Sequence, residues 1–204
     1  MQILENNLRF SGGFRNRPYT KRIVVHHSAS ASTTTIEDIH SWHLQRNWAG
    51  VGYHYVIYPD GTIYRGRPEW ARGAHAWQDE QHEANTDGLG ICLVGDFMID
   101  QPAEAQMQSL VWLIHDIWIR YPGLPVIGHK NVMATACPGE LFPWGELRKR
   151  LEGPQVAEPW KEKIIDDVLK AGLITERHNP DDTATKWFVL AVALNLLKIV
   201  KGGR

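Results

Sequence analysis

Two histidines and one cysteine stand where metal ligands are often found, at the ends of short apolar runs or in a turn. His26 ends a β-branched run, His129 follows a second apolar stub, and Cys137 lies in a turn with proline and glycine. Zinc prefers imidazole nitrogen and thiolate sulfur. A structural zinc site has four protein ligands, usually from close Cys-x-x-Cys pairs, which this chain lacks. Three ligands leave one position for a water, which zinc ionises near neutral pH into a nucleophile.

Each of these residues also has a structural interpretation, because the chain has 10 histidines and many buried histidines serve only as hydrogen-bonding groups. His40 and His43 lie at i, i+3 on an expected helix, and we expect them to be solvated at the surface. His54 follows Tyr53 on an expected strand, so it points to the opposite face and is expected to be structural. Cys92 lies in an apolar run and is expected to be a small buried hydrophobe without a disulfide.

The elements that must position these residues follow from hydrophobic periodicity. Strands are expected at residues 22–26, 89–94 and 126–127, and a hairpin turns at Pro59-Asp60-Gly61. Amphipathic helices are expected from the Thr35 N-cap to about Arg46, from about Pro102 to Tyr121, and from Gly139 to Leu151. Residues 69–88 form a long irregular stretch, which is usually functional. Strands and helices interleave, which predicts an α/β fold with a central mixed β-sheet flanked by helices.

The domain organisation is expected to be one main domain and a small helical appendage. The main domain covers residues 1–152, a linker covers 153–159, and residues 160–204 carry two amphipathic helices, about 159–171 and 184–198. A segment this short is near the lower limit for a core of its own. We expect a small C-terminal helical domain that docks, dimerises or attaches to a larger structure.

Composition excludes several classes of protein. The formal net charge of −1 provides no global field for nucleic acid. No apolar stretch reaches the roughly 18–20 residues of a membrane span, so no membrane insertion is expected. The first residues have no apolar signal-peptide core, which favours synthesis in the cytoplasm. The 9 tryptophans suit grooves that bind sugars and peptides.

Four segments, taken in order, resemble one enzyme family: VVHHSAS, VGYHYVIYPDGTIY, GLGICLVGDF and GHKNVMATACPG. They are similar to the motifs of zinc-dependent N-acetylmuramoyl-L-alanine amidases, a family that includes amidase-type phage lysozymes and peptidoglycan recognition proteins. The resemblance covers about residues 20–150. It implies a mixed sheet flanked by helices, peptidoglycan as substrate, and cleavage of the amide between the muramic acid lactyl group and the first L-alanine of the stem peptide.

The resemblance also implies roles for individual residues. His26, His129 and Cys137 match the family's Zn²⁺ ligands, whereas His27 falls on a variable position and is expected to be a neighbour of the site. Tyr53 matches a catalytic tyrosine. Thr135 falls where phage members often carry lysine and recognition-protein amidases a threonine; its hydroxyl can donate to an oxyanion but brings no charge.

Three further residues are candidates for substrate contact. His75 and Asn85 resemble positions that line the family's substrate groove. The tryptophans Trp70 and Trp77 lie in the long stretch, and either could stack on a sugar or anchor the loop. We include Trp77 with His75 and Asn85 among the expected substrate-binding residues.

The resemblance favours a phage or prophage endolysin that reaches the wall after a separate membrane-lysis protein releases it. One alternative is a cytosolic amidase that recycles muropeptides, and another is a non-catalytic peptidoglycan-binding module. The presence of Cys137 disfavours the module, because non-catalytic relatives lack this ligand. Residues 160–204 resemble wall-binding tails; the alternative is a homodimer formed through the C-terminal helices.

Overall fold

The computed structural model describes residues 1–76, 84–152 and 159–178, together with 189, 192 and 193. The chain divides into two compact units, residues 1–152 and 153–204, and each is described by itself. Among the described residues, no helix is long and apolar enough to cross a membrane.

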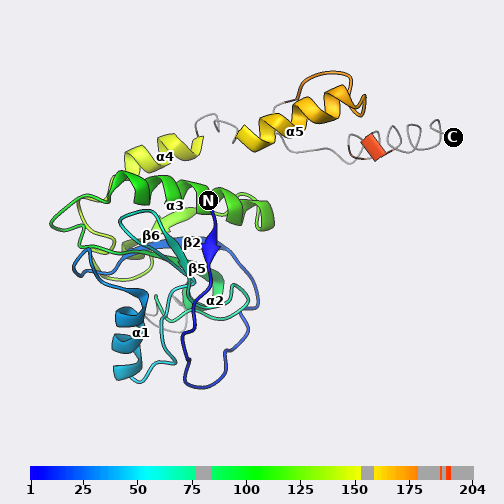
Figure 1. The fold of residues 1–204 in the computed structure, drawn as a ribbon. Helices are drawn as coiled ribbons and strands as arrows, with labels where there is room; N and C mark the ends of the chain where they lie inside the picture. The colour runs from blue at the N-terminus through cyan, green and yellow to red at the C-terminus, as the bar shows by residue number, and fades with distance from the viewer. Residues whose placement is uncertain (77–83, 153–158, 179–188, 190–191, 194–204) are drawn as a thin grey trace. The chain divides into compact units, whose positions relative to one another are not determined.

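A mixed sheet forms the centre of the first unit, as the sequence predicted (Figure 1). Its strands, among the described residues, are β1 (Ile3–Leu4), β2 (Arg22–His27), β3 (Tyr55–Ile57), β4 (Ile63–Arg65), β5 (Gly88–Leu93) and β6 (Val126–Gly128). They lie in the order β1-β4-β3-β5-β2-β6. Among these six strands only the β3–β4 pair is antiparallel, and it is the predicted hairpin; β2 pairs in parallel with both β5 and β6.

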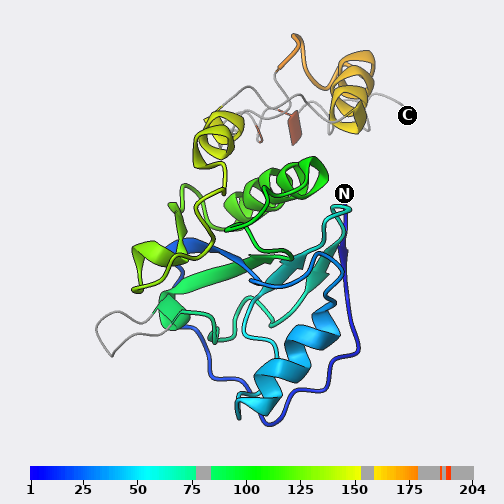
Figure 2. The same ribbon diagram turned by 90° about the vertical axis from the view of Figure 1, so that its left-hand side faces the viewer.

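Helices cover both faces of this sheet (Figures 1 and 2). In the first unit they are α1 (Ile36–Gln45), α2 (Ala84–Asp87), α3 (Glu104–Arg120), the 3₁₀ turn η1 (His129–Asn131) and α4 (Trp144–Glu152). The α3 side holds the larger core, and the α1 side a smaller one that includes Cys92. Successive residues of a strand alternate between faces. His27 therefore belongs to the α3 side, while His26 faces the α1 side.

Local signals explain where two of these helices begin. Thr35 and Asp38 form the predicted capping box at the start of α1. The prediction of a helix from Gly139 was wrong, because α4 starts only at Trp144. Gly139 has a positive φ of 110° and lies against the backbone of Phe97, and the carbonyl of Pro143 accepts the first helical hydrogen bond, from Leu147. Proline is tolerated at a helix start but not further in.

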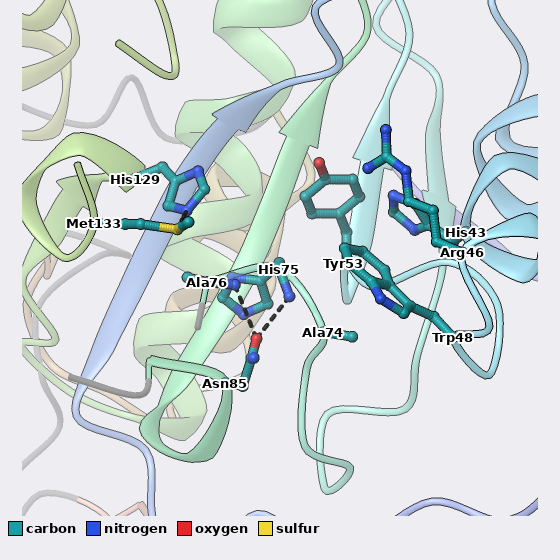
Figure 3. Close-up of a pocket in the computed structure, with 10 residues that line it drawn as sticks. All are labelled: His43, Arg46, Trp48, Tyr53, Ala74, His75, Ala76, Asn85, His129 and Met133. Atoms are coloured by element: carbon teal, nitrogen blue, oxygen red, sulfur yellow. Dashed lines mark hydrogen bonds between the residues drawn. The ribbon is translucent and has the colours of Figure 1, made fainter. Parts of the chain in front are cut away.

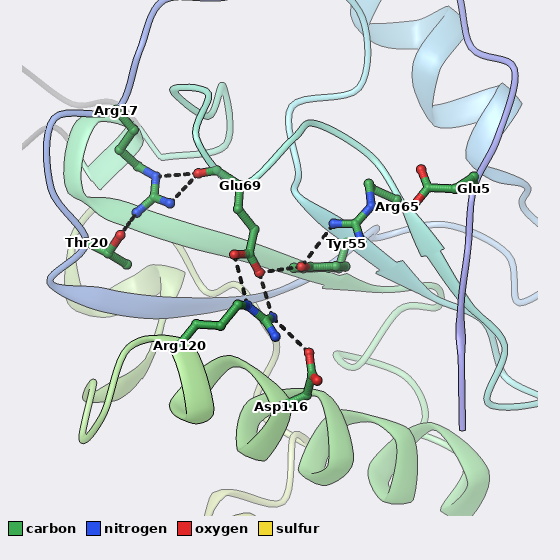
Figure 4. Close-up of polar contacts among 8 residues, drawn as sticks. All are labelled: Glu5, Arg17, Thr20, Tyr55, Arg65, Glu69, Asp116 and Arg120. Atoms are coloured by element: carbon green, nitrogen blue, oxygen red, sulfur yellow. Dashed lines mark hydrogen bonds and ion pairs between the residues drawn. The ribbon is translucent and has the colours of Figure 1, made fainter.

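An ion-pair network on the α3 side links the loop after β4 to the sheet and to α3 (Figure 4). We call it the Glu69 cluster; it consists of Tyr55, Arg65, Glu69, Asp116 and Arg120. The Glu69 carboxylate accepts hydrogen bonds from the Tyr55 hydroxyl and from Arg120, whose Nη2 lies 2.8 Å from both Glu69 and Asp116. The Glu69 carbonyl also accepts from Arg17, which secures the N-terminal segment.

The second unit is described mainly by α5 (Pro159–Lys170). Gly172, with a φ of 68°, ends this helix, and the amides of Gly172 and Leu173 bond back to carbonyls of its last turn. The predicted second helix, 184–198, lies almost entirely outside the described residues. The domain roles proposed for residues 153–204 stay predictions.

Candidate active site

The three predicted ligands meet at the carboxyl ends of two adjacent strands. His26 is near the end of β2, and His129 directly follows β6, whose Gly128 pairs with Val25. Their ring centroids are 4.5 Å apart. Cys137 lies beside them because the chain turns back after His129. A hydrogen bond from the amide of Lys130 to the carbonyl of Cys137 closes this turn. One ligand atom from each residue lies within 4.8 Å of the others.

Burial sets the protonation of this site. It lowers the pKa of His26 well below the usual value and that of His129 to about 4, so both imidazoles are neutral at pH 7. Burial raises the pKa of the Cys137 thiol to about 11. The site therefore holds two neutral imidazoles and one protonated thiol, and a cation that replaced the thiol proton would bind two nitrogens and a thiolate.

A groove of about 490 Å³ opens beside these ligands (Figure 3). Tyr53 lies on its wall, with its ring centroid 5.1 Å from that of His26. Burial raises the pKa of Tyr53 well above its usual value, so the phenol keeps its proton and can donate a hydrogen bond. The residues that line the groove are His43, Arg46, Trp48, Tyr53, Ala74, His75, Ala76, Asn85, His129 and Met133.

The predicted substrate-binding residues are placed differently from one another. His75 and Asn85 both line the groove. The Asn85 side-chain oxygen accepts from the amides of His75 and Ala76, at 2.6 and 2.9 Å, and so shapes the groove floor (Figure 3). Trp77 lies outside the described residues. Trp70 is half exposed, packs edge-on against Phe14 and does not line the groove.

Thr135 and His27 lie next to the ligands without belonging to the ligand set. The exposed Thr135 does not line the groove; its hydroxyl accepts from the Cys137 amide at 3.2 Å. His27 Nδ1 accepts from the amide of Phe97 at 3.1 Å. His54 is buried, and its ring bonds to backbone, with Nδ1 accepting from Gly90 and Nε2 donating to Ala71. Cys92 is buried, and both cysteines are free thiols.

The expectation that His40 and His43 are solvated was wrong. Both are buried, because they share the inner face of α1 with Ile36 and Ile39. Their Nδ1 atoms accept from the amides of Val51 and Gly52, at 3.1 and 2.9 Å. The i, i+3, i+4, i+7 spacing of these four residues is the signal that would have identified this face.

Sequence reasoning missed one wall of the groove, which is formed by His43, Arg46 and Trp48 (Figure 3). The Trp48 ring packs 4.7 Å from the His43 ring, and the Arg46 guanidinium lies 5.7 Å from the Trp48 ring centroid. This wall combines an aromatic face with a cation. Such a combination suits a ligand that carries both a sugar ring and carboxylates.

Comparison with known proteins identifies the family. The family model described as N-acetylmuramoyl-L-alanine amidase matches residues 15–140. The chain is 35% identical over 141 residues to an endolysin of Klebsiella phage KP32, covering 65% of this chain and 90% of the relative. It is 31% identical over 143 residues to peptidoglycan-recognition protein SC2 of Drosophila melanogaster, covering 64% of this chain and 73% of the relative.

Comparison with a solved structure supports the same family. The N-acetylmuramoyl-L-alanine amidase LysC from Clostridium intestinale URNW superposes with a TM-score of 0.69 and 36% identity, covering 74% of this chain and 97% of that one. Fold, sequence and the meeting of the predicted ligands beside a groove therefore agree. The chain belongs to the N-acetylmuramoyl-L-alanine amidase family, and its enzymatic activity is that of a peptidoglycan amidase.

Proposed function

We propose that this amidase uses a Zn²⁺ ion held by His26, His129 and Cys137 to cleave the bond between N-acetylmuramic acid and the L-alanine of the stem peptide. The observation that carries the proposal is the convergence of these three donor atoms, within 4.8 Å of one another, beside a groove that Tyr53 also lines. Two imidazoles and one thiolate suit zinc and leave a position for water. When bound, the ion supplies a water that ionises near neutral pH.

The protein's own groups carry the rest of the mechanism. Tyr53 keeps its proton, so its hydroxyl donates to the oxyanion that develops on the scissile carbonyl. His26 and His129 stay neutral because of burial, so their lone pairs remain available. The sequence predicts Thr135 as a catalytic residue together with Tyr53. Because its hydroxyl holds the Cys137 amide, we propose a positioning role for it instead.

We assign substrate binding to the groove beside Tyr53. The Trp48 ring offers a stacking face, and Arg46 offers a cation for a stem-peptide carboxylate. Asn85 contributes through its amide nitrogen, because its oxygen is already taken by two backbone amides. Trp77 remains a candidate from the sequence.

The decisive experiment measures chemistry and metal together. Purified peptidoglycan is incubated with the protein, and newly exposed N-terminal alanine is quantified alongside the zinc content of the protein. We expect release of N-terminal alanine that stops on treatment with a chelator and returns with Zn²⁺. Release of reducing sugar ends instead of alanine, or full activity without metal, would contradict the proposal.

We further propose that the protein acts as a lytic endolysin, which its similarity to a phage endolysin supports, with residues 160–204 attaching it to the wall. Removing residues 153–204 is expected to weaken binding to intact sacculi and to leave cleavage of soluble muropeptides unchanged. A deletion variant that binds sacculi normally would favour the recycling amidase. A concentration-dependent dimer that disappears on deletion would assign the segment to dimerisation instead.

A further inference from the structure

We propose that His75 is a positioning residue that holds His26 in the one tautomer able to bind a metal through Nδ1. This inference rests on the proposed zinc site. It assigns to His75 a role different from the substrate contact that its place in the groove suggested.

The two ring nitrogens of His26 have separate environments. Nδ1 faces the other proposed zinc ligands and lies 3.8 Å from the Cys137 sulfur. Nε2 points away from it and lies 3.0 Å from Nδ1 of His75. Both rings are buried, with 1% of His26 and 7% of His75 exposed. One of the two nitrogens in this short contact must donate and the other accept.

A backbone carbonyl decides which one donates. Nε2 of His75 lies 3.4 Å from the carbonyl oxygen of Gly88. A carbonyl only accepts, so this nitrogen carries the proton, and in a neutral ring Nδ1 of His75 then has the lone pair. Nε2 of His26 must therefore donate to it, which leaves the lone pair of His26 on Nδ1, facing Cys137.

The neutral state of both rings follows from their surroundings. Among the described residues, no carboxylate is hydrogen-bonded to either ring, and a buried charge without a partner is costly. The two hydrogen bonds therefore run in one direction: Nε2 of His26 donates to Nδ1 of His75, and Nε2 of His75 donates to the Gly88 carbonyl.

The structure holds His75 in a slot made for its ring. A Cβ atom on Gly73 or Gly90 would lie only 2.3 or 2.5 Å from Cδ2 of His75, so both positions require glycine. Asn85 fixes the backbone on the other side by accepting from the His75 amide (Figure 3). Both ring nitrogens of His75 thus have partners within the protein, which favours positioning over substrate recognition.

The first test substitutes His75 in two ways. His75→Phe fills the slot but removes the acceptor, and His75→Asn places an oxygen where Nδ1 stands. Zinc dissociation constants are measured by competition with a chelator. We expect His75→Phe to weaken zinc binding by about 10–100-fold, the usual cost of losing a partner of a metal ligand, and His75→Asn to recover part of that loss. His115→Phe, a histidine on α3, is the matched control and should bind zinc as the wild type does.

The second test needs no variant to fold. Nitrogen-15 NMR of the zinc-free wild type reports the tautomer of His26, and we expect the proton on Nε2. A proton on Nδ1, or a zinc affinity unchanged in folded His75→Phe, would overturn the inference. Because neither readout needs peptidoglycan, a protein that binds zinc through this tautomer and releases no alanine would disprove the proposed function and leave this inference standing.

Discussion

Two polar clusters in the first unit, one mostly buried and one partly exposed, meet the cost of desolvation in different ways. The histidine cluster, which consists of His26, His54, His75 and His129, is neutral. Hydrogen bonds to backbone and from ring to ring hold His26, His54 and His75, and His129 contacts the Met133 sulfur. The Glu69 cluster is charged, and its carboxylates are matched by arginines. The neutral rings of His26 and His129 keep lone pairs for a cation, whereas the charges of the Glu69 cluster are already paired with one another. The first arrangement serves chemistry, and the second serves stability.

The largest effect on zinc content and activity is expected from substitution of Cys137, the sulfur ligand of the proposed zinc site. Cys137→Ser replaces a soft thiolate by a neutral hydroxyl, so zinc content and alanine release should fall close to background. The unfolding midpoint of the metal-free protein should change by no more than about 4 °C, because the fold does not depend on this sulfur. Metal analysis and calorimetry provide the two readouts. A variant with full zinc content and full activity would show that the ligand assignment is wrong.

Tyr53→Phe tests the proton donor in the groove and leaves the three proposed zinc ligands in place. The ring and its packing stay, and only the proton donor is lost, so turnover should drop by roughly 10²–10³ with zinc content unchanged. Steady-state kinetics on soluble muropeptide give the comparison with the wild type. If turnover stays the same, Tyr53 is a packing residue and the oxyanion donor is elsewhere.

Glu69→Gln should affect stability alone. Tyr55 and Arg120 lose their charged acceptor, and the free energy of unfolding at pH 7 should fall by about 1–3 kcal/mol, toward the lower end because Arg120 is 39% exposed. Urea unfolding measures this loss. Specific activity of the folded variant should match the wild type, and a large loss of activity would show that the two clusters are coupled.

The same variant has a pH signature with a defined sign. Burial raises the pKa of Glu69, but hydrogen bonds from Arg120 and Tyr55 outweigh it and lower the pKa below the ordinary 4.5. A lowered carboxyl pKa contributes stability in full above pH 4.5 and loses it as the pH falls through the folded value. The stability difference between wild type and Glu69→Gln should therefore shrink below pH 4.5. A difference that grows in acid would contradict the lowered pKa.

The smallest effect is expected at Thr135. Thr135→Ala removes one hydrogen bond to the Cys137 amide, so turnover should fall by less than about tenfold and zinc affinity only slightly. Thr135→Ser, which keeps the hydroxyl, is the matched control. A loss comparable to that of Tyr53→Phe would place Thr135 in the catalytic machinery.

Local patterns were sufficient for much of the fold. The β-branched run of β2, the hairpin at Pro59-Asp60-Gly61 and the Thr35 capping box depend on neighbours in sequence, and the structure confirms them. The prediction failed at Gly139, where a close approach to Phe97 delays the helix, and at His43, where tertiary contacts bury a residue expected at the surface. At Gly139 a distant segment decides the outcome, whereas for His43 the spacing of the buried residues of α1 was a local signal that the prediction did not use.

The sequence by itself determined which residue types were available: two imidazoles and a thiol at strand ends or in a turn, and a tyrosine in a separate motif. Only the tertiary structure decided their geometry. Parallel pairing of β2 with β6 brings His129 next to His26 across more than 100 residues of chain. The slot between Gly73 and Gly90 sets the hydrogen bond from His26 to His75. Hydrogen-bond direction and burial depend on atoms brought together from distant parts of the chain, so no local pattern encodes them.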